Sequence, residues 1–164
     1  MPLSPMGIVH TLLGVIAIVS VISLLVQDKQ ISFKPILGKV YILATLTTAA
    51  SALTIFKHGG FNTAHALAIL TIAAAVSGVI LEKTQLFKSW STYFVNLCYS
   101  ATILFHALPT ATEIMTRFPM DNPMVSSLKD PLLQSTFKVI FIVFVVLLSL
   151  QLLWLHKQRK AAMQ

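Results

Sequence analysis

Residues 136–155 have the sequence TFKVIFIVFVVLLSLQLLWL, and this stretch decides the fold class of the chain. Its single charged residue is Lys138, close to its start. A helix of this length, rising about 1.5 Å per residue, crosses a hydrocarbon core of roughly 30 Å. Because backbone groups cannot stay unpaired in lipid, the stretch must be a helix rather than an open strand. It therefore predicts a transmembrane helix.

Four further apolar stretches of similar length precede it, at approximately residues 7–26, 37–56, 63–82 and 91–110. The charged residues inside them lie near their ends, where long side chains can reach the membrane interface. We therefore predict an all-α integral membrane helical bundle with five transmembrane helices, forming a single transmembrane domain over residues 1–164. The first stretch is expected to be retained as a span, because no Lys or Arg precedes it and no small-residue cleavage site follows it.

The composition excludes several other classes of protein. Hydrophobic residues make up 56% of the chain and charged residues 10%, against roughly a quarter charged in a soluble domain. The 12 Lys and Arg residues lie in short gaps between the apolar stretches, which fits membrane topology rather than a nucleic-acid partner. The expected partners are the lipid bilayer and either another membrane protein or a second copy of the chain.

The distribution of Lys and Arg predicts the orientation. If the N-terminus lies outside, eight basic residues fall on the inner side and four on the outer side. Basic residues concentrate on the cytoplasmic side of membrane proteins. We therefore predict an outer N-terminus and an inner C-terminus, in the bacterial inner (plasma) membrane.

The gap at residues 111–135 is expected to be an outer loop. Pro109 is expected to end the helix before it, and Pro119, Pro123 and Pro131 interrupt the segment that follows. Regular helix is therefore not expected between residues 119 and 131. Residues 112–118 are expected to form either a short interfacial helix or a loop folded over the mouth of the bundle.

Three histidines fall at one predicted depth in the membrane. His10, His65 and His106 each lie near the outer end of a different predicted span, roughly 3–6 Å inside its boundary at the helical rise per residue. Imidazole is the commonest metal ligand and an axial ligand of haem iron. We predict that at least two of these rings come together in an outward-facing site for haem b or a transition metal. The alternative is a set of interfacial histidines with polar tips in water.

Further side chains could support this site. His58 lies in the gap before the third span, and Met6 lies one helical turn before His10, where thioether and imidazole together would suit Cu(I). Glu113 follows His106 by seven residues and could act as an additional acceptor.

Polar residues also mark one face of the fourth span. Asn96, Tyr99 and His106 share this face, which forms either a polar path to His106 or hydrogen bonds to neighbouring helices. Glu82 and Lys83 are interpreted as flanking charge at the inner end of the third span. No catalytic residue is predicted, because no Ser–His–Asp or Cys–His arrangement can be assembled.

Three sequence segments carry a resemblance. They are Val9-His10 with the span around Gly14, LGKVY at residues 37–41, and GFNTAHAL at residues 60–67. Together they resemble an uncharacterised bacterial family of small, predicted multi-span integral membrane proteins of unknown function. In that family a His-Arg pair commonly precedes the second motif and another precedes the fourth span, where this chain has Lys34-Pro35 and Lys88-Ser89. The resemblance implies a membrane protein and no particular activity.

Two functions from different classes follow from these patterns. The first is a small inner-membrane protein whose histidine site binds haem b or a metal for electron transfer or metal handling. The alternative is a non-catalytic accessory subunit or assembly factor of a larger membrane complex. A small transporter is disfavoured, because no inverted repeat or pair of broken helices is evident.

Overall fold

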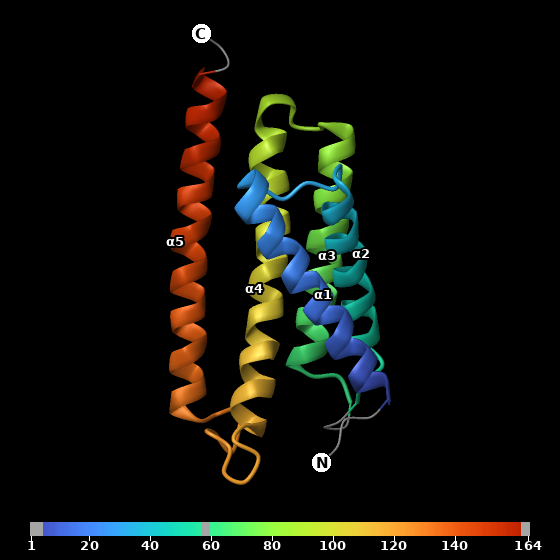
Figure 1. The fold of residues 1–164 in the computed structure, drawn as a ribbon, viewed down its shortest axis with the longest axis vertical. Helices are drawn as coiled ribbons and strands as arrows, with labels where there is room; N and C mark the ends of the chain where they lie inside the picture. The colour runs from blue at the N-terminus through green and yellow to red at the C-terminus, as the bar shows by residue number, and fades with distance from the viewer. Residues whose placement is uncertain (1–4, 57–59, 162–164) are drawn as a thin grey trace. The chain divides into compact units, whose positions relative to one another are not determined.

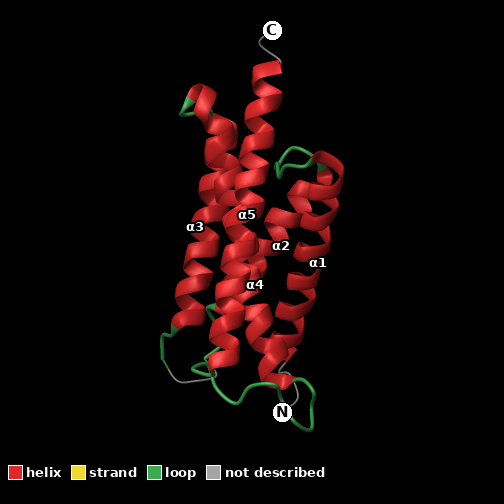
Figure 2. Ribbon diagram, turned by 90° about the vertical axis from the view of Figure 1, so that its left-hand side faces the viewer, coloured by secondary structure: helices red, strands yellow, loops and turns green. Residues whose placement is uncertain are grey.

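A computed structural model describes residues 5–56 and 60–161 as helices joined by short connectors (Figure 1). The α-helices are α1 (Pro5–Asp28), α2 (Ile36–Ala52), α3 (Thr63–Thr84), α4 (Ser91–Arg117) and α5 (Pro131–Ala161), with a 3₁₀ turn, η1 (Lys88–Trp90), before α4. Strands do not occur among these described residues (Figure 2). The prediction of an all-α fold is confirmed for this part of the chain.

Four helices, α1, α3, α4 and α5, are long and apolar enough to cross a membrane. Their length and composition indicate an integral membrane protein. Helix α2 is shorter, with 17 residues, so the prediction that its span reaches residue 56 was wrong. The helix ends at Ala52, and the amides of Leu53, Thr54 and Ile55 bond to carbonyls three residues back instead of four. This tighter turn is a common way for an α-helix to end.

The prediction that Pro109 ends the fourth helix was also wrong. Helix α4 continues through Pro109 to Arg117, so residues 112–117 are its last turns rather than a separate interfacial helix or a loop. The hydroxyl of Thr110 donates to the carbonyl of His106 at 2.7 Å. Hydroxyl groups of this kind help to satisfy backbone groups around a proline in membrane helices.

Residues 118–130 form a connector without regular helix, as the proline spacing predicted. The connector is shorter than the expected loop at residues 111–135, because α5 begins at Pro131. Proline suits the first position of a helix. Asp130 caps this end, since its Oδ1 atom accepts a hydrogen bond from the amide of Leu132 at 2.9 Å.

Contacts divide the chain into two compact units. Unit 1 is Met1–Ile103 and unit 2 is Leu104–Gln164, so the boundary falls within α4. Unit 2 has a small buried cluster formed by Met115, Val125 and Leu133, with Phe137 packed against it. The amide of Val125 donates to the carbonyl of Met115 at 3.1 Å, which fixes the connector to the last turns of α4.

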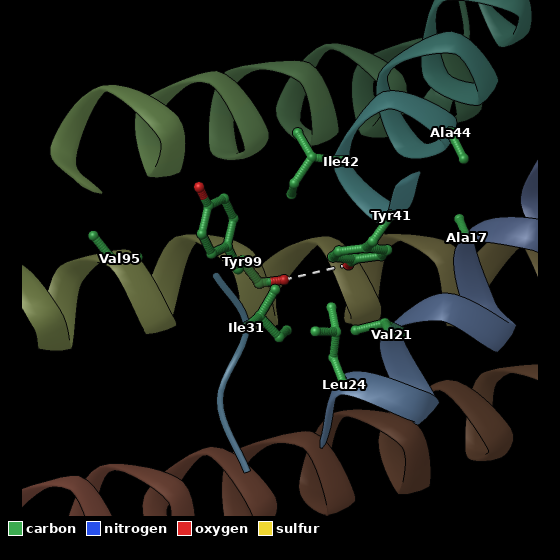
Figure 3. Close-up of a cluster of buried hydrophobic side chains, with 9 residues drawn as sticks. All are labelled: Ala17, Val21, Leu24, Ile31, Tyr41, Ile42, Ala44, Val95 and Tyr99. Carbon is green, nitrogen blue, oxygen red and sulfur yellow. Dashed lines mark hydrogen bonds between the residues drawn. The ribbon is translucent and has the colours of Figure 1, made fainter. Parts of the chain in front are cut away.

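The core of unit 1 brings together side chains from α1, α2, the connector between them and α4 (Figure 3). Its buried members are Ala17, Val21, Leu24, Ile31, Tyr41, Ile42, Ala44, Val95 and Tyr99. Two glycines allow close approach around this core. A Cβ atom on Gly78 would lie 2.4 Å from the Tyr99 ring, and one on Gly38 would lie 1.7 Å from the carbonyl oxygen of Ser32. Neither position has room for a side chain without movement of its neighbours.

Candidate functional site

One end of unit 1 holds the start of α1, the end of α2 and the start of α3 (Figure 1). We call it the histidine end, because it carries His10 on α1 and His65 on α3. Helix α2 connects the two positions. His10 contacts Thr48 and Ser51 in the last two turns of α2, and His65 stacks on Phe56, which follows α2. Both histidines therefore lie at one end of unit 1, and their common depth in a membrane stays a prediction.

His10 is half-buried and its ring orientation is set by α2. Its Nδ1 atom lies 3.1 Å from the carbonyl oxygen of Thr48 and 3.0 Å from the Ser51 hydroxyl. A carbonyl oxygen only accepts hydrogen bonds, so Nδ1 is the donor and carries the proton of the neutral ring. The Nε2 atom of the neutral ring then carries the lone pair. Donation from Nδ1 to a backbone carbonyl is the arrangement that orients most metal-ligating histidines.

His65 is buried, with 2% of its surface exposed, and its ring stacks on two aromatic rings. The ring centroids of Phe56 and Phe61 lie 4.6 and 5.5 Å from that of His65. His65 also completes a capping box at the start of α3, because its Nδ1 atom accepts from the amide of Asn62 at 3.3 Å. The neutral ring therefore carries its proton on Nε2, the opposite tautomer from His10.

Two buried polar side-chain atoms have no hydrogen-bond partner among the described residues, Nε2 of His65 and Oγ1 of Thr48. Both lie at the histidine end, since the carbonyl of Thr48 is the acceptor for His10. Buried polar groups are nearly always paired, so each exception calls for a specific explanation. A bound ligand or ordered water at this end would supply the missing partners.

The other predicted site residues have separate surroundings. His106 is half-buried and belongs to unit 2, so its part in a shared site stays a prediction. Glu113 forms an ion pair with Arg117 one turn along α4. Met6 is exposed one turn before His10, and His58 lies outside the described residues. Within residues 5–56 and 60–161, no three His, Cys, Asp or Glu side chains are grouped as a metal site.

The polar residues of α4 form bonds at the other end of unit 1. The Tyr99 hydroxyl donates to Oε2 of Glu82 on α3 at 2.9 Å, so for Tyr99 the interhelical bond is confirmed. The Nδ2 atom of Asn96 donates to the carbonyl of Thr92 in its own helix at 2.8 Å. Tyr41 on α2 joins the same region through its hydroxyl, which lies 2.5 Å from that of Thr102.

Glu82 has a role that the sequence analysis missed. Its Oε1 atom accepts from the Ser32 hydroxyl at 2.5 Å, and its Oε2 atom accepts from the amide of Phe33 at 2.8 Å as well as from Tyr99. The carboxylate thus joins α3, α4 and the connector between α1 and α2, and it is more than a flanking charge. A sequence signal was present, because Gly78 and Glu82 lie one turn apart on the same face of α3. Gly78 makes room for the ring of Tyr99, and the hydroxyl of this ring donates a hydrogen bond to the carboxylate of Glu82.

Comparisons of the chain with protein-family models, curated proteins and solved structures found no match. The resemblance seen in three sequence segments therefore stays a prediction.

Proposed function

We propose that this chain is a small integral membrane protein of the bacterial inner membrane, with a ligand site at its histidine end that serves electron transfer or metal handling. The observation that carries the proposal is the position of the two unpartnered buried atoms. Nε2 of His65 and Oγ1 of Thr48 both lie at this end in the described part of the chain. Polar groups left without partners in a buried place are a cost that a bound group would remove.

The two histidines offer complementary chemistry to such a group. His10 has its ring oriented by a hydrogen bond from Nδ1 to a backbone carbonyl, the arrangement of most metal-ligating histidines, which suits coordination of haem iron or of a transition metal. His65 presents an N–H donor on the opposite tautomer, which suits an oxygen atom of the same ligand rather than its metal. For His65 to ligate through Nε2, the proton would have to leave that atom. If that proton moved to Nδ1, the Nδ1 atom could no longer accept the hydrogen bond from the Asn62 amide.

Haem binding is the form of the proposal that this geometry favours. Haem iron takes one or two protein ligands, whereas a structural metal site usually takes four. The flat rings of Phe56, Phe61 and His65 also provide an aromatic surface at this end. His10 would be an axial ligand, and His65 would hold a polar substituent.

The test is the Soret absorbance and metal content of the purified full chain, produced with haem precursors and with added metals. We expect a Soret band or a stoichiometric metal in the wild-type protein, and loss of it in His10→Ala. His65→Gln separates ligand binding from helix capping, because glutamine at this position can restore the capping box. We expect His65→Gln to keep the fold and to weaken binding. His156→Ala, at the exposed end of α5, is the matched control.

Two results would contradict this function. One is a wild-type protein with neither chromophore nor metal under these conditions. The other is full retention of the ligand in His10→Ala. The predicted contribution of His106 is tested by comparing His10→Ala, His106→Ala and the double variant. A shared site predicts that each single change causes the same loss as both together, whereas independent residues predict additive losses.

A second candidate function, an accessory subunit or assembly factor, is supported by the bonding of Glu82. A carboxylate that accepts three hydrogen bonds from two separate segments, the connector between α1 and α2 and helix α4, has the surroundings of a structural group. If the chain is a subunit, gentle extraction should yield a stoichiometric complex much larger than its own 18.0 kDa with bound detergent. A ligand-free chain that migrates alone would contradict both candidate functions.

A further inference from the structure

The second end of unit 1 collects the charged residues that the structure describes in that unit. It contains the connector between α1 and α2 and the turn between α3 and α4 (Figure 1). The described Asp, Glu, Lys and Arg residues of unit 1 are Asp28, Lys29, Lys34, Lys39, Glu82, Lys83 and Lys88. All seven belong to this end, which we call the lysine end. Lysines outnumber acids there by five to two.

Glu82 brings lysines from distant parts of the sequence together. Its carboxylate holds the amide of Phe33 at 2.8 Å. Lys34 follows Phe33 directly, and Lys83 follows Glu82 directly. The Lys83 Nζ atom lies 5.6 Å from the centre of the Phe33 ring, which confirms that the two segments meet. Lys34 and Lys83 therefore belong to one patch, although 49 positions separate them in the sequence.

Among the described residues, the carboxylate of Glu82 forms hydrogen bonds with neutral groups and no ion pair with a lysine. Both oxygen atoms of Glu82 already accept hydrogen bonds from Ser32, Phe33 and Tyr99. Across the described residues, Lys34, Lys39 and Lys88 form no ion pair. Their charge is available to a negatively charged group from outside the chain.

Exposed apolar side chains lie beside the lysines. Leu86, Phe87 and Trp90 are 66%, 47% and 65% exposed in the turn that follows α3, next to Lys88. Aromatic and basic side chains together are typical of the headgroup level of a membrane. A free phosphate ion would contact only the lysines, whereas a lipid would also place its acyl chains against these apolar groups.

We propose that the lysine end binds the phosphate of an anionic lipid headgroup, with Lys34 and Lys83 as the residues that hold it. Clusters of basic residues at membrane ends recognise anionic headgroups by charge. The proposal requires only that the protein is embedded in a membrane, and it is independent of a ligand at the histidine end.

The test uses Trp90 as a local probe in the full chain. The chain has two tryptophans, so Trp154→Phe leaves Trp90 alone. The protein is reconstituted in phosphatidylcholine vesicles containing either brominated phosphatidylglycerol or brominated phosphatidylcholine as quencher. We expect phosphatidylglycerol to quench Trp90 at a mole fraction lower by about fivefold or more, because each of the two lysines near an anionic headgroup supplies a factor of about five.

Matched variants identify the residues involved. The double variant Lys34→Gln/Lys83→Gln should lose the preference for phosphatidylglycerol. Brominated phosphatidylcholine should still quench its Trp90, which shows that the variant is embedded in the membrane. Lys129→Gln with Lys138→Gln, exposed lysines of unit 2, should leave the preference intact. Equal quenching by both lipids in the Trp154→Phe protein would overturn the proposal, as would an unchanged preference in Lys34→Gln with Lys83→Gln. If the two lipids quench equally but inorganic phosphate changes the emission of Trp90 and chloride at equal ionic strength does not, the ligand is free phosphate and the lipid assignment is wrong.

Discussion

Gly78 packs so closely against α4 that the structure leaves no room for a side chain at this position of α3. A Cβ atom there would lie 2.4 Å from the Tyr99 ring, whereas one on Gly14 would meet the Thr48 methyl group at 3.8 Å, an ordinary contact. We expect Gly78→Ala to lower the free energy of unfolding by about 1–3 kcal/mol, because the ring must move. Gly14→Ala should be neutral or stabilising by up to about 1 kcal/mol, since alanine is the better helix former. Reversible unfolding in detergent measures both. Equal effects of the two changes would contradict this packing.

Glu82 can be tested in a similar way at the level of one residue. Glutamine is uncharged and has one acceptor oxygen in place of two, so in Glu82→Gln the donors Ser32, Phe33 and Tyr99 cannot all keep their present bonds, and at best a hydroxyl must turn to accept from the new N–H group. We expect a loss of about 1–3 kcal/mol in the free energy of unfolding. Glu113→Gln is the control, because its exposed pair with Arg117 is worth about 0.3–0.5 kcal/mol. A Glu82→Gln protein as stable as Glu113→Gln would show that the three bonds do not hold unit 1 together.

For single residues, the sequence predicted the position along the bundle better than the hydrogen-bond partners of the side chain. The position of His10 and His65 at one end of unit 1 could be derived from the order and direction of the helices. The opposite tautomers could not, because they depend on Thr48 and Asn62, whose backbone groups come near the rings only after folding. Glu82 was missed for the same reason, since its donors are distant in the sequence.

The start of α3 supports a prediction at the scale of one element. The Asn62 side chain accepts from the amide of Ala64 at 2.9 Å, and the His65 side chain returns a bond to the Asn62 amide. We expect Asn62→Ala to cost about 1 kcal/mol of stability and to increase hydrogen exchange in the first turn of α3. Asn62→Asp keeps the acceptor and should behave as the original residue does. If both variants exchange as slowly as the wild-type protein, the cap does not hold this turn.

The positions of the helices were largely predictable, and their ends were not. Apolar length located each helix, because lipid leaves the backbone no other regular form in a single span. Pro109 was expected to end α4, yet proline is tolerated in membrane helices where hydroxyl groups such as that of Thr110 bond nearby carbonyls. At the end of α2, the change to a tighter turn depends on local bonds between residues 50 and 55, which hydropathy does not reveal.

For the whole molecule, the length of α1, α3, α4 and α5 predicts stable integration in a membrane. We expect the chain to stay in the membrane pellet after extraction with alkaline carbonate and to be released only by detergent. The physical reason is the apolar surface of these helices, which water cannot solvate without a large free-energy cost. A peripheral membrane protein, which carbonate releases, is the control. Release of this chain by carbonate would contradict its assignment as an integral membrane protein.

The most direct measurement is the labelling of single cysteines by a membrane-impermeant maleimide in intact cells. In a Cys98→Ser background, Gly60→Cys reports the histidine end, where an added Cβ meets no atom within 4 Å, and Leu86→Cys reports the lysine end, where the side chain is 66% exposed. An outward-facing histidine site predicts labelling at position 60 in intact cells and at position 86 only after the membrane is opened. Labelling at position 86 but not at position 60 in intact cells would contradict the outward-facing site.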